Sequence, residues 1–352
     1  DHRDLHRVDR RQRQMCIRDR FMAVQGANPI TAYTAMLKGA VGSVAALANT
    51  GVRAAPLLLG GIAVAFGFKA GMLNVGIEGQ IYAGGAAAAA IGLIPLPVPA
   101  WFHMTLAVVA GFLGGVIWGI IPAYLKAYRG ISEIVVTLML NYVGIHFVSL
   151  LVHEPSPMAE KGAFYPQSPP LLPSSHLPIL IKGTSLHAGI LLGIALALII
   201  YFVLQYTPFG FKTRMLGQNP EAARYAGVNV KRQTALVLLI SCGIGGLAGT
   251  GEVIGLKGRL FDYFSMGLGY DAIAVALMAN SHPLGVILTA FFFGALRAGA
   301  GRMETIAGVK TPISQVIQAL AVLFVIAIGF AEYSRAARLA QKEQQEEISH
   351  ES

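Results

Sequence analysis

The sequence is poor in charge, in cysteine and in clusters of ligand-type residues, and each shortage excludes a class of function. Only 13% of its 352 residues are charged, and its two cysteines, Cys16 and Cys242, set up no disulfide framework. Its nine histidines are scattered without the spacing of metal ligands. The dipeptide Gly-Lys is absent, so the chain has no phosphate-binding loop of the G-x-x-x-x-G-K-S/T kind. We therefore expect no ATP hydrolysis by that route, no catalytic residue, no metal and no cofactor in this chain.

A dinucleotide-binding signature is present only in a weak form. Gly243, Gly245 and Ala248 match the pattern G-x-G-x-x-A, but they stand inside a long apolar run. Small residues in such a run let two membrane helices approach closely, and we interpret Gly245 and Gly249 in this way. A second glycine series is interpreted alike: Gly111, Gly115 and Gly119.

Apolar residues are what the sequence has in abundance: 55% are hydrophobic, and the mean hydropathy is +0.59. A helix needs about 20 mostly apolar residues to cross the ~30 Å core of a bilayer. The sequence therefore predicts an all-α, polytopic transmembrane helix bundle with about eight or nine membrane segments, some short or broken. A soluble all-α protein is the alternative, and this hydropathy disfavours it. The long runs are Met104–Leu125, Ile131–Val152, Leu186–Tyr206, Thr234–Leu256 and Pro312–Phe330; the short ones are Pro56–Phe68, Val75–Leu96, and a pair meeting near Asn280–Pro283, Leu268–Ala279 and Leu284–Ala300.

The distribution of basic residues orients the bundle. The polar loop Thr207–Gln233 has five basic residues against Glu221 alone, whereas the loop His153–Ser185 has two residues of each sign. By the positive-inside rule the first loop is cytoplasmic and the second is external. The net charge of +9 is thus an orientation signal. A nucleic-acid surface is disfavoured, because no basic stripe is interleaved with aromatic residues.

The first twenty residues do not share this pattern. They contain seven Arg and four Asp and have no apolar h-region, so they are not a signal peptide. We interpret residues 1–20 as a disordered or artefactual arm; a basic cytoplasmic arm is the alternative. Residues 21–332 then form the transmembrane domain, and residues 333–352 form a polar cytoplasmic tail.

The cytoplasmic loop contains a short helix with both ends marked. Asn219 is suited to cap its N-terminus, and Pro220 fits the first helical position, where its missing N–H needs no partner. Glu221 lies in the first turn, where the helix dipole favours an anion, and Gly227 can take the left-handed position after the last turn. A helix of about two turns is unstable alone in water. We therefore expect its neighbours to hold it and a partner to bind it.

Several polar residues fall at membrane depth, where they are costly. Three of them stand in FKAGMLNVGIEGQIYAGG, whose glycines predict a discontinuous helix beside a cavity. For a carboxylate, an interfacial cap or an ion pair is the alternative, and it is favoured for Glu133 and Glu252. The amides are as suited to bridging helices as to touching a ligand. The five candidates for the interior of the bundle are Asn74, Glu78, Gln80, Asn141 and Asp271.

Four stretches carry a resemblance to a known family: FKAGMLNVGIEGQ, ISEIVVTLMLNYV, GQNPEAARYAGVNVKR and GYDAIAVALMANSHPLGVIL. They resemble the membrane permease subunit of bacterial ATP-binding-cassette importers for simple sugars, nucleosides and branched-chain amino acids. The first three are most similar to nucleoside and guanosine-type uptake permeases. The resemblance runs from about Phe21 to Phe330. Family members carry a further transmembrane helix before the segment NPITAY, and here the arm stands in its place.

The resemblance implies a division of labour among subunits. Two permeases, identical or paralogous, form a pathway in the bacterial plasma membrane, a cytoplasmic ATPase hydrolyses ATP, and an external binding protein delivers the ligand. For this chain it implies nucleoside uptake, with a simple sugar such as a pentose as the alternative. Two other classes stay open: a secondary transporter in which Glu78 or Asp271 titrates, and a channel or scaffold without transport.

The resemblance also assigns residues to these tasks. We expect the three amides to face the ligand, because neutral amides both donate and accept hydrogen bonds, and Tyr142 lies beside one of them. The two carboxylates, Glu78 and Asp271, are expected to hold the broken helices in place. The element that couples the permease to its ATPase would comprise Gly217, Asn219, Pro220, Glu221, Ala222, Ala223, Arg224 and Gly227.

Overall fold

The computed structural model describes residues 29–307 and residue 316, which fall into two units. One unit comprises residues 1–39 and 299–352, and the other is Ala40–Ala298. The arm 1–20, the predicted span Pro312–Phe330 apart from residue 316, and the tail 333–352 lie outside the described residues. Every site residue predicted above lies in the Ala40–Ala298 unit.

Within the described ranges the chain consists of helices and loops, with only two isolated β-bridges. This confirms the all-α prediction. Six of the described helices are long and apolar enough to cross a membrane, and two shorter ones lie among them, so the predicted count of eight or nine segments is not established. The long helices are α3 (Val44–Phe68), α5 (Ala100–Arg129), α6 (Glu133–Val152), α7 (Gly189–Tyr206), α10 (Val230–Thr250, extended by a π-helical turn, Gly251–Lys257) and α12 (Pro283–Ala307); the shorter ones are α4 (Ile77–Leu93) and α11 (Leu268–Met278).

Burial separates central helices from peripheral ones. In α3 and in α10 with its π-helical turn, 89% of the most apolar window is buried, whereas the figure is 22% in α5 and α6. Glycines explain how the central helices pack so closely. A Cβ on Gly115 would lie 2.3 Å from the carbonyl oxygen of Cys242, and one on Gly249 would lie 1.9 Å from that of Ile81. The interpretation of these glycines as packing residues is confirmed.

Two helices are longer than their apolar runs predict. Helix α3 was expected over Pro56–Phe68, but it begins at Val44, with Pro56 inside it and the Ser43 hydroxyl accepting a hydrogen bond from the N–H of Ala46. The polar residues Asn49, Thr50 and Arg53 interrupt the apolar run without ending the helix, and the Thr50 hydroxyl donates to the Ala40 carbonyl. Helix α12 likewise continues beyond the predicted Leu284–Ala300 to Ala307.

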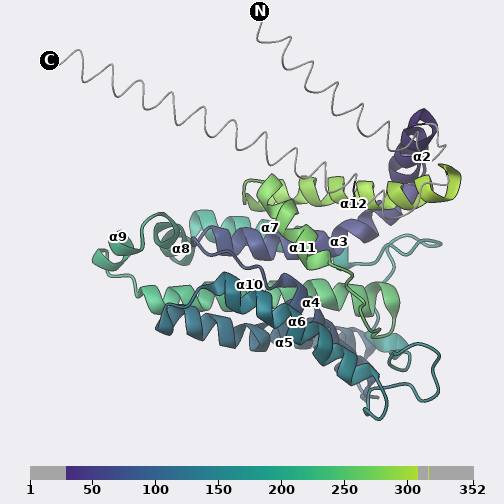
Figure 1. Cartoon of the computed structure of the whole chain (residues 1–352), viewed down its shortest axis with the longest axis horizontal. Coiled ribbons are helices and arrows are strands. Elements are labelled where there is room, and N and C mark those ends of the chain that lie inside the picture. Colours follow the sequence, from purple (N-terminus) through teal and green to yellow (C-terminus); the bar gives the residue numbers. More distant parts are fainter. Residues whose placement is uncertain (1–28, 308–315, 317–352) are drawn as a thin grey trace, which may run out of the picture. The chain divides into compact units, whose positions relative to one another are not determined.

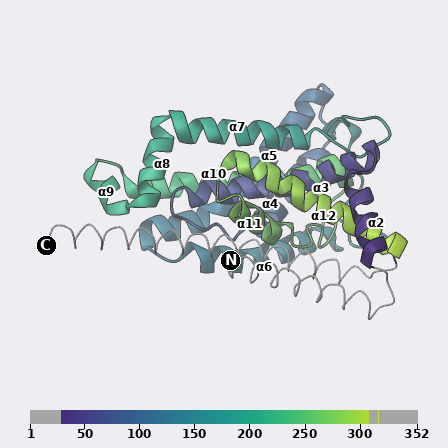
Figure 2. The same cartoon turned by 90° about the horizontal axis from the view of Figure 1, so that it is seen from above.

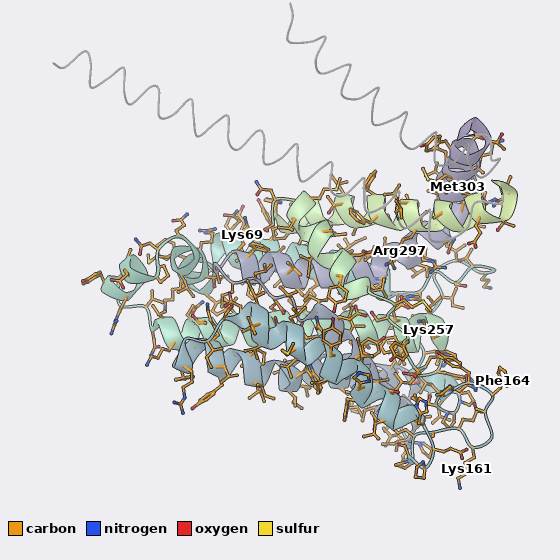
Figure 3. The ribbon with its side chains drawn as sticks, in the orientation of Figure 1. Lys69, Lys161, Phe164, Lys257, Arg297 and Met303 are labelled. Atoms are coloured by element: carbon orange, nitrogen blue, oxygen red, sulfur yellow. The ribbon has the colours of Figure 1, made fainter. Side chains whose placement is uncertain are left out.

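The two loops that differ in charge lie at opposite ends of the Ala40–Ala298 unit. One end carries α8 (Pro208–Gln218) and α9 (Pro220–Tyr225), as Figure 1 shows. The loop with Lys161 and Phe164 lies at the other end (Figure 3). Helix α7 runs along one side of the unit and leads directly into α8 (Figure 2). The structure thus separates the two loops as the charge argument requires.

Candidate functional site

The predicted discontinuous helix is a break between α3 and α4. Helix α3 ends at Phe68, the chain turns at Gly71 with a φ of +73°, and α4 begins at Ile77. The buried side chains of Asn74, Gln80, Ser241 and Cys242 meet at this break, and we call them the amide cluster. Their mutual contacts fix the start of α4 against α10.

The amide cluster satisfies its own hydrogen-bonding groups. The Gln80 amide nitrogen donates to Asn74 Oδ1 at 2.9 Å and to Cys242 Sγ at 3.2 Å. In return, Asn74 Nδ2 donates to Gln80 Oε1 at 3.2 Å and to Ser241 Oγ at 2.9 Å. The Ser241 hydroxyl donates a hydrogen bond to the Ala63 carbonyl of α3 at 2.7 Å. One network therefore joins α3, the break, α4 and α10.

Asn141 fixes the same break from the side of α6. Its Oδ1 accepts the backbone N–H of Gly79 at 2.8 Å, and its Nδ2 donates to the Val75 carbonyl at 3.0 Å. The same nitrogen lies 3.5 Å from the hydroxyl oxygen of Tyr270 on α11. Backbone groups freed by an interrupted helix need such partners where water is absent. Asn141 supplies both a donor and an acceptor.

The two carboxylates act on α11. Glu78, 2% exposed, accepts the backbone N–H of Gly267 at 3.0 Å and that of Gly269 at 2.7 Å, one on each oxygen. It thus satisfies unpaired donors at the N-terminus of α11 and complements the dipole of that helix. Asp271 pairs with Arg297 of α12, with Oδ2 2.5 Å from Nη2. Each carboxylate therefore joins two helices.

Four of the five predicted interior residues, Asn74, Glu78, Gln80 and Asn141, meet with buried side chains around the start of α4. The fifth, Asp271, lies in the first turn of α11, where its side chain is 28% exposed and paired with Arg297. Asn74, Gln80 and Asn141 are 0–1% exposed. Their hydrogen bonds go to one another, to the backbone, to Ser241 and Cys242, and to Tyr270, so a ligand reaches these amides only if the cluster opens. The sequence did not indicate several of their partners: Ser241, Gly267, Gly269 and Arg297. Ser241 could have been identified from the sequence, because its hydroxyl stands inside an apolar run. Nothing in the sequence marks the glycine N–H groups as partners.

The ion-pair interpretation of Glu133 and Glu252 is confirmed. Glu133 Oε2 lies 2.6 Å from Lys126 Nζ, and its Oε1 accepts the backbone N–H of Leu73 at 3.4 Å. Glu252 lies in the π-helical turn, 3.6 Å from the ammonium group of Lys257. Glu133 therefore ties α6 to the break between α3 and α4.

Helix α9 has the ends that its sequence predicts. Asn219 Oδ1 accepts the N–H groups of Glu221 at 2.9 Å and Ala222 at 3.0 Å. Beyond the last turn, Gly227 has a φ of +80°, and the helix is closed by a hydrogen bond from the next residue back to Ala223. Ala223 is fully buried, whereas Tyr225 on the same helix is 90% exposed. The helix is held on one face and free on the other.

Comparison with known proteins identifies the family of this chain. The model of the family described as "Branched-chain amino acid transport system / permease component" matches residues 46–327. The chain belongs to this permease family. It is 32% identical to the guanosine ABC transporter permease protein NupP of Bacillus subtilis, over 87% of this chain and 88% of that protein. It is 33% identical to the glucose ABC transporter permease protein TsgB13 of Haloferax volcanii (86% and 82%) and 29% identical to the nucleoside ABC transporter permease protein NupB of Lactococcus lactis (88% and 86%).

In this permease the end of α8 contacts the break between α3 and α4 without any side chain between them. A Cβ on Gly217 would lie 2.4 Å from the carbonyl oxygen of Lys69 and 2.9 Å from the nitrogen of Gly71. A Cβ on Gly71 would lie 3.2 Å from the Cα of Gly217. Gly217 lies near the end of α8, and only Gln218 and Asn219 separate it from α9, so the chain just before α9 contacts the segment that leads into α4 backbone to backbone.

Proposed function

We propose that this subunit of an ATP-binding-cassette importer takes up nucleosides across the bacterial plasma membrane. As a permease it forms the membrane pathway. Relatives named for guanosine or nucleoside transport match it over most of its length, which supports nucleosides as the substrate. A simple sugar is the second candidate, because a glucose permease is similar to the same extent. An external binding protein would deliver the ligand, and a second permease subunit, identical or paralogous, would complete the pathway.

Helix α9 is proposed as the contact with a separate ATPase subunit. The observation that carries this assignment is a solvent-exposed, capped helix joined through Gly217 and Gly71 to the start of α4. Such a helix is too short to be stable by itself, so its exposed face has a use outside the subunit. The coupling element comprises Gly217, Asn219, Pro220, Glu221, Ala222, Ala223, Arg224 and Gly227.

The interior polar residues are proposed to line and control the pathway. When ATP draws the ATPase subunits together, α9 moves with them, and the contact between Gly217 and Gly71 passes this movement to the break before α4. The helices around the break then exchange one packing for another as rigid bodies. The residues that make this exchange are Asn74, Glu78, Gln80, Asn141 and Asp271.

Uptake into proteoliposomes tests this function. The permease is reconstituted with its ATPase and binding protein, ATP is enclosed, and entry of radiolabelled guanosine, ribose, glucose and leucine is measured. Guanosine should accumulate only with ATP, and a proton ionophore should leave its uptake unchanged. Uptake that follows a proton gradient without ATP would show a secondary transporter. Accumulation of a sugar but not of guanosine would favour the second candidate.

A further inference from the structure

Helix α6 presents two exposed faces of different character. Tyr142, His146 and Ser149 follow one another at spacings of four and three residues, so they lie on one face of the second half of the helix, while the exposed apolar Val135 and Met139 continue that face in the first half. Tyr142 is 56% exposed and occupies the tenth of the 20 helical positions, near the middle of the span. Exposed polar groups at this depth are costly against lipid tails. This polar face of α6 is therefore expected to meet water or a ligand.

The other exposed face of α6 is apolar. Val143 is 53% exposed, nearly the same fraction as its neighbour Tyr142, and Leu150 is 71% exposed. Beside them the Phe147 ring contacts Trp118 of α5, with centroids 5.9 Å apart. Such a face is suited to lipid. The two faces of α6 thus differ at the same depth, which makes Tyr142 and Val143 a matched pair.

The polar face of α6 lies on the side of α11 and of the loop that precedes it. The Ser149 hydroxyl donates to Asp262 Oδ2 at 3.4 Å. Tyr270 is 40% exposed, and its hydroxyl oxygen lies 3.5 Å from the amide nitrogen of Asn141, the residue that precedes Tyr142 on α6. Two exposed phenols from different helices therefore flank Asn141, next to the start of α4.

Two carboxylates at the starts of α4 and α11 already have partners inside the protein. Both oxygens of Glu78 accept backbone N–H groups, and Asp271 is paired with Arg297. The two phenols thus offer rings and hydroxyl groups, and the Asp262 carboxylate, which accepts a hydrogen bond from Ser149, lies near the end of the same face. A zwitterionic amino acid would need a charged partner on each of its ends. A neutral ligand with an aromatic base and several hydroxyl groups matches what the surface offers.

We propose that Tyr142 and Tyr270 form a contact surface for the nucleoside within the membrane, the rings stacking on the base and the hydroxyls bonding to the ribose. This proposal rests on the proposed function and moves the ligand from the buried amides to the exposed phenols beside them. The amide cluster then serves as the support of this surface. A second copy of the subunit or a lipid on the same face are the competing occupants.

Accessibility to a charged thiol reagent tests the surface. Three variants are made in a Cys16→Ser background that keeps the fully buried Cys242. They are Tyr142→Cys, Tyr270→Cys and, as the matched control, Val143→Cys. In the complete transporter in proteoliposomes, a sulfonate-bearing methanethiosulfonate should modify the first two at least about 10-fold faster than the third, because the charged reagent follows water. Guanosine delivered by the binding protein should slow modification at positions 142 and 270, and leucine should not.

Transport gives a second readout. Removing either phenol removes its stacking on the base. Tyr142→Ala and Tyr270→Ala should therefore each lower guanosine uptake at saturating binding protein by about 10-fold. Val143→Ala should change uptake by less than about 2-fold, because this side chain lies outside the proposed surface. Tyr142→Phe should keep most of the uptake, since it keeps the ring.

Each contrary result overturns a distinct part of the inference. Absent modification at 142 and 270 would show a face packed on lipid or on a second copy. Modification without protection by guanosine would show water but no ligand, and protection by ribose alone would refute the stacking role. If the unaltered transporter fails to take up guanosine at all, the proposed function fails before this surface is tested.

Discussion

Asn74 and Asn219 do the same local task in two different surroundings. Each lies ahead of a helix and accepts backbone N–H groups: Asn74 from Gly76 at 3.0 Å, and Asn219 from Glu221 and Ala222. Asn74 is 0% exposed and is also bonded to three side chains, whereas Asn219 is exposed at the surface. The comparison teaches that burial converts a helix cap into a joint between four chain segments. We expect the buried Asn74 to contribute mainly to stability and the exposed Asn219 to contribute mainly to coupling with the ATPase.

The largest effect is expected from Asn74→Ala. It leaves the N–H of Gly76 and the buried amide oxygen of Gln80 without a partner, at about 1–3 kcal/mol for each group, and it opens a cavity beside Ser241 and Cys242. Because folded proteins are stable by only about 5–15 kcal/mol, little folded permease should remain. Asn219→Ala, the matched control, should cost about 1 kcal/mol, as for an exposed cap. Thermal unfolding of the purified permease in detergent measures both.

An Asn74→Ala permease that unfolds at the normal temperature but has lost guanosine uptake would reverse this assignment. The amide cluster would then act on the ligand directly, as the sequence suggested, and its packing role would be secondary.

The next largest effect is expected in α9, on transport alone. Gly227→Val forces a β-branched residue into a φ of +80°, where nothing within 4 Å hinders a side chain, so backbone strain is the only cost. Gly227→Asn is the control, because Asn tolerates this conformation. Gly227→Val and Glu221→Lys should abolish ATP-driven uptake while the amount of inserted permease stays normal. Immunoblots of membranes and uptake by the same vesicles measure the two quantities.

Normal uptake by both Gly227→Val and Glu221→Lys, with the ATPase still bound, would make α9 a mere connector. Loss of uptake in Gly227→Asn to the same extent would show that the glycine is needed for contact rather than for its conformation.

An intermediate effect is expected where the two regions meet. Gly217→Ala improves helix propensity by about 1 kcal/mol, yet its Cβ would lie 2.4 Å from the Lys69 carbonyl oxygen, so α8 must move off the break. We expect roughly a 10-fold loss of uptake with ATP hydrolysis retained, because the coupling energy between two sites is typically about 1–3 kcal/mol. Gly71→Ala should act more weakly, with its closest contact at 3.2 Å. Measuring ATP hydrolysed per guanosine imported detects this uncoupling.

Gly130→Ala is the control for Gly71→Ala. The two glycines have φ values of +69° and +73°, so both substitutions carry the same backbone strain, but a Cβ on Gly130 meets nothing within 4 Å. If Gly130→Ala uncouples transport as much as Gly71→Ala does, the contact between α8 and the break has no special part in coupling.

The smallest effect is expected for Lys126→Gln. The Lys126 side chain is 32% exposed although that of Glu133 is only 7%, and Gln keeps a hydrogen-bond donor for the Glu133 carboxylate, so the loss should stay near that of an exposed ion pair, about 0–1 kcal/mol. Glu133 keeps its bond to Leu73, so the tie between α6 and the break survives. Uptake should stay within about 2-fold of normal, in line with that small energy. A larger loss would mean that the ion pair, and not the bond to Leu73, holds the break.

How far the sequence could predict the structure depends on how local the signals are. Helix α9 was predictable from end to end, because Asn219, Pro220 and Gly227 act within three residues of the groups they serve. The full length of α3 was not, because Asn49, Thr50 and Arg53 interrupt the apolar run although the helix continues through them, and the partner of Thr50, the Ala40 carbonyl, lies ten residues away. Hydropathy records the composition of a helix, and it does not record which partner satisfies a polar side chain.

The interior residues show the same limit. The sequence alone identified Asn74, Gln80 and Glu78, because polar side chains are costly at membrane depth. In the structure all three are buried at the break. Their partners could not be predicted, since Ser241 lies 167 residues from Asn74 and Gly269 lies 191 residues from Glu78. The donors at Gly267 and Gly269 are backbone groups that every residue type except proline has. Composition can therefore identify a costly side chain without revealing what it binds.

The π-helical turn Gly251–Lys257 determines how two charged side chains meet. In an α-helix two residues five apart point about 140° away from each other, whereas residues four apart share a face. Glu252 and Lys257 are five apart and still form an ion pair, because a turn closed by bonds between residues five apart brings them together. Deleting one residue between Glu252 and Lys257 would place the pair four apart on a regular α-helix, where they still share a face. The π-helical turn thus accommodates one extra residue without separating this ion pair.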